Sequence, residues 1–253
     1  MKWGSFGPVH IATLLFAAAM ITGLYFALRR ASKQVQTAVL GVLSFSGIAA
    51  IIYNLVTWGS PLEYLPLHLC SINALLLPIV VFTRNKTLGN MLLVWCLGAL
   101  AALVVNMAQA EYELNSWTFA FYYFPHVLEF GIPVLLFKLG LIEKHPKYIL
   151  STIAITMAVY TGIHFINVGL NAYCQANQIL DWAGNVIQVN YMYSIVPENP
   201  LLALFKQVIP YDYWYMYMIV PILVVYLSAI YLPQFRSARR HKPVRRRAAA
   251  AHM

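Results

Sequence analysis

The stretch VHIATLLFAAAMITGLYFAL (residues 9–28), followed directly by Arg29 and Arg30, decides the class of fold. It contains no Asp, Glu, Lys or Arg, and a helix of this length, at about 1.5 Å per residue, spans the roughly 30 Å hydrocarbon core of a bilayer. Six further apolar runs follow, at approximately 35–57, 64–83, 88–109, 117–137, 148–168 and 211–232. The sequence therefore predicts an all-α polytopic membrane protein, a bundle of about seven transmembrane helices.

The composition agrees with this class. Hydrophobic residues make up 61% of the 253 residues and charged residues 10%, against about 25% in a soluble domain. The net charge of +9 would indicate nucleic acid as the partner of a soluble protein, but here the basic residues lie between apolar runs and in the C-terminal tail. Three cysteines cannot make a disulfide framework, and their odd number leaves at least one free thiol, so a small secreted scaffold is excluded.

The positions of the basic residues predict the orientation. Fifteen of the 17 lie after the first, third and fifth apolar runs and in the tail. The opposite side holds only Lys2 and Lys206, together with six of the eight acidic residues. By the positive-inside rule, we expect the N-terminus outside and the C-terminus in the cytoplasm.

Two segments lie outside the predicted spans. Residues 236–253 form a basic cytoplasmic tail beyond the bundle of residues 1–235, and we expect anionic inner-leaflet lipid, not nucleic acid, to bind it. Residues 169–210 form a long outer connection, rich in Asn, Gln and Tyr, which we expect to be a lid or a partly re-entrant cap. The first run has no cleavage site, so we expect it to be retained as a helix.

Polar side chains inside the spans are the main functional signal, because a charged group at the centre of a membrane helix is penalised by about 2.5–3.5 kcal/mol. In the predicted orientation, polar groups from several spans fall at similar depth in the outer half of the membrane. They are His68, Cys70, Asn73, Asn106, His126, Glu129, His164 and Asn167, with Asn54 nearby. A polar cavity within the bundle, open toward the outer side, is predicted.

Helical spacing sorts these groups into faces. The three faces are Glu63, Cys70 and Asn73; Tyr122, His126 and Glu129; and Tyr160, His164, Asn167 and Asn171. His68 is two positions from Cys70 and therefore points away from it. A structural interpretation also exists, since membrane asparagines often serve as interhelical hydrogen-bond partners worth about 0.6 kcal/mol each.

Thiol chemistry is the interpretation that these residues favour. Cys70 is the candidate nucleophile and His126 the candidate base, with Glu129 one turn further along to hold the imidazole ring. A lipid acyl ester entering from the membrane would transfer its acyl group to the thiol as a thioester. The candidate amide donors to the developing oxyanion are Asn73, Asn106 and Asn167. His164 is the second choice for the base.

Two other classes of function stay open. The three histidines with a carboxylate or thiolate would suit Zn²⁺ in a lipid hydrolase, although the chain has no HxxxH or HExxH pair. A non-catalytic lipid-binding or transport protein would use the same cavity. Retinal binding is excluded because the last run has no lysine, and the spans lack the dense carboxylates of a proton pump. The favoured chemistry needs no metal and no cofactor.

Three segments resemble the bacterial YwaF-like family of integral membrane proteins. They are LPLHLCSINALLLPI (residues 65–79), FPHVLEFGIPVLL (residues 124–136) and VNYMYSIVPENPLL (residues 189–202). That family is similar to a eukaryotic transmembrane acyltransferase of ether-phospholipid synthesis. The resemblance covers most of the chain from the second run onward, and its His-Leu-Cys and Asn-Tyr-Met-Tyr elements occur together.

The resemblance implies a multi-spanning helical bundle in a bacterial cell membrane, with a cysteine as the acyl carrier. Cys70 is the residue that matches the motif cysteine, and Tyr191 lies in the Asn-Tyr-Met-Tyr element as a supporting residue. Membrane lipids would be the acyl donor and acceptor. The identities of these lipids do not carry over from the family.

Overall fold

The computed structural model describes residues 1–105, 109–181, 183–198 and 200–240, and within these ranges the protein is helical, with two isolated β-bridges and no strand. The long helices are α1 (Pro8–Leu28), α2 (Lys33–Ser44), α3 (Ser46–Thr57), α4 (Leu69–Thr83), α5 (Lys86–Val104), α6 (Trp117–Lys138), α7 (Tyr148–Asn177) and α9 (Ile219–Arg240). The short ones are η2 (Tyr191–Tyr193), α8 (Pro200–Val208) and η3 (Trp214–Met218).

Six helical segments in the described part of the chain are long and apolar enough to cross a membrane. They are residues 8–28, 33–57, 86–104, 117–138, 148–177 and 214–234. The second joins α2 to α3, and the last joins η3 to α9. α4 is a seventh, shorter apolar helix of 15 residues. The expected polytopic helical membrane protein is confirmed.

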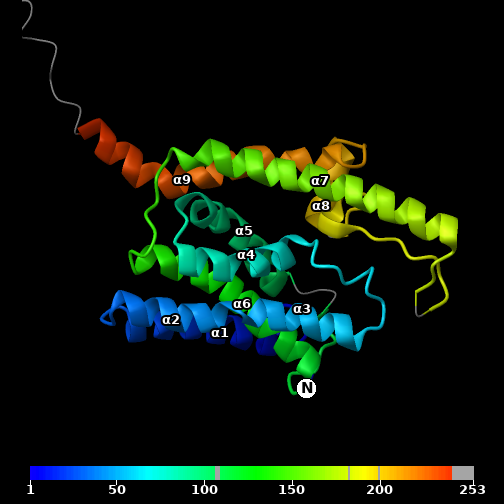
Figure 1. Cartoon of the computed structure of the whole chain (residues 1–253), viewed down its shortest axis with the longest axis horizontal. Helices are drawn as coiled ribbons and strands as arrows, with labels where there is room; N and C mark the ends of the chain where they lie inside the picture. Colours follow the sequence, from blue (N-terminus) through cyan, green and yellow to red (C-terminus); the bar gives the residue numbers. More distant parts are fainter. Residues whose placement is uncertain (106–108, 182, 199, 241–253) are drawn as a thin grey trace, which may run out of the picture.

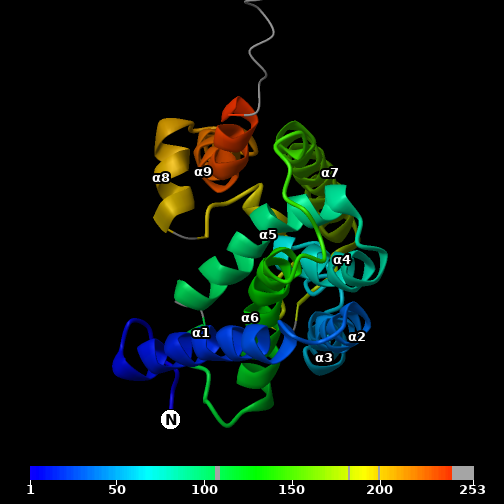
Figure 2. The same cartoon turned by 90° about the vertical axis from the view of Figure 1, so that its left-hand side faces the viewer.

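Most helices follow the long axis of the molecule (Figure 1). α7, α8 and α9 form one layer, α1, α2 and α3 lie on the opposite side, and α4 and α5 lie between them (Figures 1 and 2). α6 contacts each of α1 to α5, so it is the central helix of the bundle. It runs unbroken through Pro125 and Pro133, which membrane helices tolerate when neighbouring helices surround the freed carbonyls.

The connections that the charge pattern assigns to one side meet at one end of the bundle. Lys33, just after α1, donates a hydrogen bond from Nζ to the backbone carbonyl of Leu139, just after α6. Arg84, after α4, donates from Nη2 to Thr37 Oγ1 in α2 at 2.8 Å. These contacts bring the connections after α1, α4 and α6 together.

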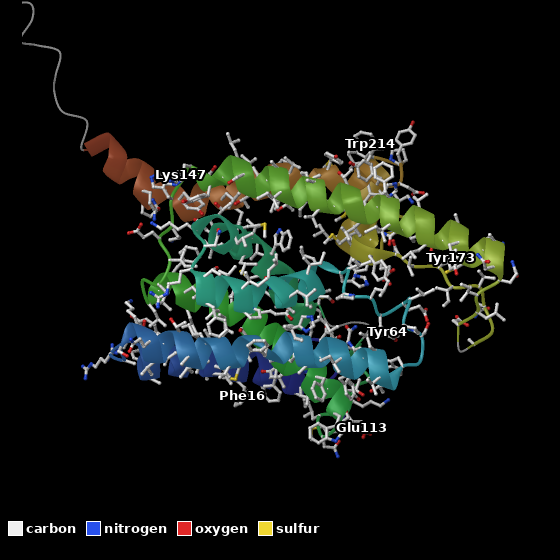
Figure 3. The ribbon with its side chains drawn as sticks, in the orientation of Figure 1. Phe16, Tyr64, Glu113, Lys147, Tyr173 and Trp214 are labelled. Carbon is white, nitrogen blue, oxygen red and sulfur yellow. The ribbon has the colours of Figure 1, made fainter. Side chains whose placement is uncertain are left out.

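The opposite end holds the remaining connections. Figure 3 shows Lys147 at the first end and, toward the other end, Tyr64, Glu113 and Tyr173. The N-terminus lies there too, since the backbone N–H of Trp3 donates to the carbonyl of Tyr112 at 2.8 Å. The connections thus gather at two opposite ends of the bundle, a two-ended arrangement that agrees with the charge pattern. Which end faces the cytoplasm stays a prediction.

α4 begins later than the predicted span 64–83. Pro66 lacks an N–H donor and disfavours a helical conformation at Leu65, so residues 58–68 form an irregular connection and the helix begins at Leu69. Glu63 therefore lies outside the helix and does not share a helical face with Cys70. At about 1.5 Å per residue, α4 is about 22 Å long, less than a bilayer core. Since Arg84 fixes its C-terminal end beside α2, its N-terminal end lies inside the bundle.

The outer connection folds back along α7, which extends beyond the predicted end at residue 168 to Asn177. At its tip, Asp181 Oδ1 accepts hydrogen bonds from the backbone N–H groups of Asn185 and Ala183, both at 2.8 Å. These bonds, that from Asn185 above all, hold the pKa of Asp181 below its usual range. The chain then returns through η2 toward the N-terminal end of α4. The basic tail is helical to Arg240, and residues 241–253 lie outside the described ranges.

Candidate functional site

Cys70 is the second residue of α4, so its thiol lies at the N-terminal end of a helix inside the bundle. His68, which precedes the helix, provides no side-chain cap for the first turn. Cys70 is a free cysteine, and the residue is partly exposed. Helix N-terminal N–H groups stabilise negative charge, so they can stabilise an oxyanion that forms beside Cys70.

Glu129 of α6 is close to Cys70 in space. Its side chain is 4% exposed, and its carboxyl interacts electrostatically with the thiol. A Cβ at Gly47 of α3 would lie 2.9 Å from Glu129 Oε1, so the carboxyl reaches the junction of three helices. Oε2 has no hydrogen-bond partner among the described residues. A buried carboxyl with a free oxygen in a membrane helix is a strong indication of a functional site.

His126 precedes Glu129 by one turn of α6, but the carbonyl of Tyr122 orients its ring. Nδ1 lies 2.6 Å from this carbonyl oxygen, and the rings of His126 and Tyr122 lie 4.4 Å apart between centroids. Because a carbonyl oxygen only accepts, Nδ1 carries the hydrogen, and Nε2 is the basic nitrogen of the neutral ring. The carbonyl thus has the positioning role that the sequence assigned to Glu129.

Asn73 lies one turn after Cys70 on the same face of α4. Its side chain is completely buried, and within the described ranges neither its Nδ2 nor its Oδ1 has a hydrogen-bond partner. Leaving such a group unpartnered in the interior costs about 1–3 kcal/mol, so native proteins rarely do it without a functional reason. Asn73 is therefore available to a ligand beside Cys70.

Aromatic side chains lie beside the residue that precedes α4. The ring of His68 lies 5.2 Å from that of Tyr191 and 5.7 Å from that of Tyr193. The spacing predicted that His68 lies on the face of the helix that points away from Cys70. His68 instead precedes the helix. It lies in the connection before α4 and faces Tyr191 and Tyr193.

We call this group of residues the Cys70 cluster: His68, Cys70, Asn73, Tyr122, His126, Glu129 and Tyr193. Asn73 and Glu129 are buried, and the other five side chains are partly accessible. The cluster thus combines a reachable thiol with buried polar atoms. An apolar depression of about 540 Å³ lies outside the cluster, lined by Ile209, Tyr211, Trp214 and Tyr217.

Asn167 and Asn171 of α7 hold the outer connection with both ends of their amides. Asn167 Nδ2 donates to the carbonyl of Tyr191 at 2.8 Å, and Asn167 Oδ1 accepts the N–H of Tyr191 at 3.0 Å. Asn171 makes the same pair of bonds with Val189, at 3.0 and 2.7 Å. Both ends of the Asn167 amide thus bond to the backbone of the outer connection. This is the structural role that the sequence also allowed for membrane asparagines.

His164 belongs to this second group. Its Nδ1 lies 3.0 Å from Ser194 Oγ, and Asn167 Nδ2 donates to the same oxygen at 2.9 Å. A Ser–His pair suggests a nucleophile, but the Ser194 hydroxyl oxygen already accepts the bond from Asn167 and so helps to hold the outer connection. The structure places His164 beside Ser194, and His126 beside Tyr122.

Asn106, the third amide candidate, lies outside the described residues. Within the described ranges, no group of three or more His, Cys, Asp or Glu side chains is arranged to hold a metal ion, so the donor geometry does not favour the zinc interpretation. Tyr193 and Ser194 were missed at the sequence level. The Asn-Tyr-Met-Tyr-Ser order marks the segment, but periodicity gives no side-chain directions outside helices and strands.

Comparison with known proteins gives a match over nearly the whole chain. The model of the TMEM164 family matches residues 5–244, a range that contains every helix from α1 to α9 and the whole Cys70 cluster. No curated protein and no solved structure matches.

Proposed function

The chain belongs to the TMEM164 family of membrane proteins, and from this premise we propose that it is a membrane-embedded acyltransferase or acyl hydrolase that uses Cys70 as a thioester carrier. The acyl donor is a lipid ester that enters from the membrane. The resemblance to the YwaF-like family supports this proposal, and with it a location in a bacterial cell membrane.

One observation carries the proposal: a free cysteine, partly exposed as a residue, lies in the first turn of a short helix that begins inside the bundle and has no side-chain cap. Irregular backbone at membrane depth is tolerated where it is buried in protein or lines a cavity, and half-helix N-termini of this kind bind anionic groups of substrates. A helix N-terminus also favours thiolate and provides N–H donors for a tetrahedral intermediate. A buried free thiol in an apolar helix has neither property.

In the first half-reaction, the Cys70 sulfur attacks the carbonyl carbon of the ester while His126 Nε2 takes the thiol proton. The carbonyl electron pair moves to oxygen, and the resulting oxyanion is stabilised by first-turn N–H groups of α4. When the intermediate collapses, the C–O bond breaks and the departing alkoxide takes the proton from His126. The products are an acyl thioester on Cys70 and a lipid hydroxyl.

The second half-reaction reverses these roles. A hydroxyl from a second lipid, or water, gives its proton to His126 Nε2 and attacks the thioester carbonyl, and the Cys70 thiolate leaves and is reprotonated. Glu129, one turn further along α6, supports both steps, because its carboxyl dipole stabilises the His126 imidazolium. A lipid acceptor gives transfer, and water gives hydrolysis.

The test uses the purified full chain in phospholipid nanodiscs with p-nitrophenyl palmitate as the acyl donor. We expect the wild-type protein to release p-nitrophenol and to carry a hydroxylamine-sensitive acyl group on the Cys70 peptide, detected by mass spectrometry. Cys70→Ala should reduce both to the uncatalysed level, because the nucleophile is gone. Cys70→Ser should form at most an ester that resists neutral hydroxylamine.

Cys96→Ser is the matched control. The Cys96 thiol donates to the carbonyl of Leu93 inside α5, at 3.2 Å, and a serine hydroxyl keeps this bond, so activity should remain within about twofold of wild type. Unchanged acyl transfer in Cys70→Ala would overturn the proposal. Binding of the ester without any covalent product in the wild-type protein would favour a lipid-binding or transport protein instead.

A further inference from the structure

Two consecutive bulky residues of the outer connection have a left-handed backbone. Met192 has φ +52° and Tyr193 has φ +56°, although neither is glycine. Non-glycine residues adopt this conformation rarely, and consecutive ones persist only where the surrounding structure holds them. Such strain is typical of sites where one side chain must point in a particular direction.

Hydrogen bonds fix the backbone on both sides of this strained pair. Before it, the Asn167 amide holds both the N–H and the carbonyl of Tyr191. After it, the carbonyl of Ser194 accepts the N–H of Tyr213 at 2.8 Å, and the Ser194 hydroxyl is held by Asn167 and His164. The segment therefore cannot relax without losing these bonds.

The strained turn places Tyr193 beside the start of α4. The Tyr193 ring lies 5.7 Å from that of His68, which is two residues before Cys70. The Tyr193 side chain is partly accessible, so a ligand at the thiol can reach it. Because the turn belongs to the outer connection and the thiol to α4, only the tertiary fold brings these two groups together.

The hydroxyl of Tyr193 differs from those of the neighbouring tyrosines. The Tyr122 hydroxyl donates to the carbonyl of Ala102 at 3.0 Å, and the Tyr191 hydroxyl donates to the carbonyl of Leu62. The Tyr193 hydroxyl has no hydrogen-bond partner among the described residues. It is therefore the one of these three phenols whose donor is free for a ligand at Cys70.

We propose that Tyr193 is a catalytic residue that donates a hydrogen bond from its hydroxyl to the acyl carbonyl oxygen as Cys70 attacks, and that His164, Ser194 and Asn167 are its positioning residues. This inference rests on the proposed thioester chemistry. No proton is transferred from the phenol. As the carbonyl electron pair moves to oxygen, the O–H of Tyr193 stabilises the negative charge opposite the first-turn N–H groups of α4.

The inference gives a role to a residue of the outer connection that lies beside the start of α4. A phenol is a stronger hydrogen-bond donor than an amide, and because it carries no charge its burial costs less than that of an ionised side chain. Because hydrogen bonds hold the turn on both sides, the Tyr193 hydroxyl is in position before the substrate binds. Such preorganisation is the source of oxyanion stabilisation.

The experiment compares two reactions of the same thiol in the full chain in nanodiscs. Acylation of Cys70 by p-nitrophenyl palmitate passes through an oxyanion, whereas alkylation by iodoacetamide does not. We expect Tyr193→Phe to slow acylation by about 10²–10³-fold, the usual effect of removing one oxyanion donor, and to change alkylation of the Cys70 peptide by less than twofold. KM for the ester should change little.

Two further variants complete the comparison. Tyr226→Phe, in which a phenol of α9 loses its bond to the carbonyl of Leu93, is the matched control and should leave both rates within about twofold of wild type. Ser194→Ala should slow acylation without slowing alkylation, and by less than Tyr193→Phe, because the donor remains but is held less firmly.

Each outcome separates the inference from the proposed function. If wild-type acylation occurs and Tyr193→Phe acylates at the wild-type rate, the inference is overturned and the thioester proposal stands. If Tyr193→Phe slows acylation and alkylation equally, Tyr193 only shapes access to the thiol, and the inference is again overturned. If the wild-type thiol is alkylated but never acylated, both proposals fail.

Discussion

At the scale of single residues, the Cys70 cluster contains buried polar atoms that have no hydrogen-bond partner among the described residues. Asn73 and Asn90 are both completely buried asparagines on apolar helices. Asn90 Nδ2 donates to the carbonyls of Lys86 and Glu143, at 2.7 and 3.1 Å, and Asn90 Oδ1 accepts the Tyr231 hydroxyl. Asn73 makes no such bond within the described ranges. The same residue type thus stabilises the fold at one position and is available to a ligand at the other.

This difference predicts opposite effects of the same substitution. Asn73→Leu removes unpartnered polar atoms, so the free energy of unfolding should stay constant or rise by about 1–3 kcal/mol. Asn90→Leu leaves several buried groups unpaired and should lower it by about 2–5 kcal/mol. Thermal unfolding in detergent micelles measures both changes. Equal destabilisation by the two substitutions would show that Asn73 is also a structural residue.

Asn73→Leu should also slow acylation of Cys70 despite the retained stability. The amide is a candidate donor to the oxyanion, and loss of one such donor reduces the rate by about 10²-fold or more. Acylation by p-nitrophenyl palmitate in nanodiscs gives the measurement. A stable Asn73→Leu protein with the wild-type rate would remove Asn73 from the proposed site.

At the scale of elements, the site depends on the close approach of α3, α4 and α6. A Cβ at Gly47 of α3 would lie 2.5 Å from the Cβ of Ala74 and 2.9 Å from Oε1 of Glu129, both shorter than ordinary contacts. Small residues allow such approach between membrane helices, where packing replaces the hydrophobic effect as the driving force. Gly47 therefore sets the position of the Glu129 carboxyl relative to α4.

Gly47→Ala should consequently disturb both packing and the site. We expect a loss of about 1–3 kcal/mol in the free energy of unfolding, because the helices must separate, and a lower acylation rate because Glu129 moves. Gly162→Ala on α7 is the matched control, since nothing lies within 4 Å of a Cβ there. It should leave stability unchanged or raise it by up to about 1 kcal/mol. Thermal unfolding measures the stability of both variants. If Gly47→Ala is as stable as Gly162→Ala, the close approach of α3 to α4 and α6 is contradicted.

At the scale of the whole molecule, the Cys70 cluster lies between two parts of the bundle. α4 and α6 carry the thiol, Glu129 and His126, whereas α7 holds the outer connection that supplies Tyr193. The contacts between basic connections at one end, and between the N-terminus and Tyr112 at the other, fix which loops share a side. The charge pattern then predicts that the Tyr193 side faces outward.

Accessibility labelling tests this orientation. Glu113 and Lys147 are exposed and lie toward opposite ends of the bundle (Figure 3). In intact cells, a membrane-impermeant maleimide should label Glu113→Cys above the background of the parent protein. Lys147→Cys should be labelled only after permeabilisation. The reverse pattern would invert the orientation, and labelling of both from outside would contradict the two-ended arrangement.

The sequence alone determined the class of protein, the approximate spans and the grouping of the loops on two sides. These properties depend on local composition: an apolar run long enough to cross a bilayer forms a helix because its backbone must satisfy its own hydrogen bonds there. Helical spacing also placed His126 and Glu129 on one face of α6, and Cys70 and Asn73 on one face of α4.

Only the tertiary structure decided which polar groups meet. Pro66 moved the start of α4 to Leu69, which placed Cys70 at an uncapped helix end and His68 in the connection before it. His126 took the carbonyl of Tyr122 as its partner, His164 took Ser194, and Asn167 took the backbone of Tyr191. The physical reason is that a side chain in an irregular segment is directed by hydrogen bonds to residues distant in sequence. Periodicity along a single helix carries no information about those partners.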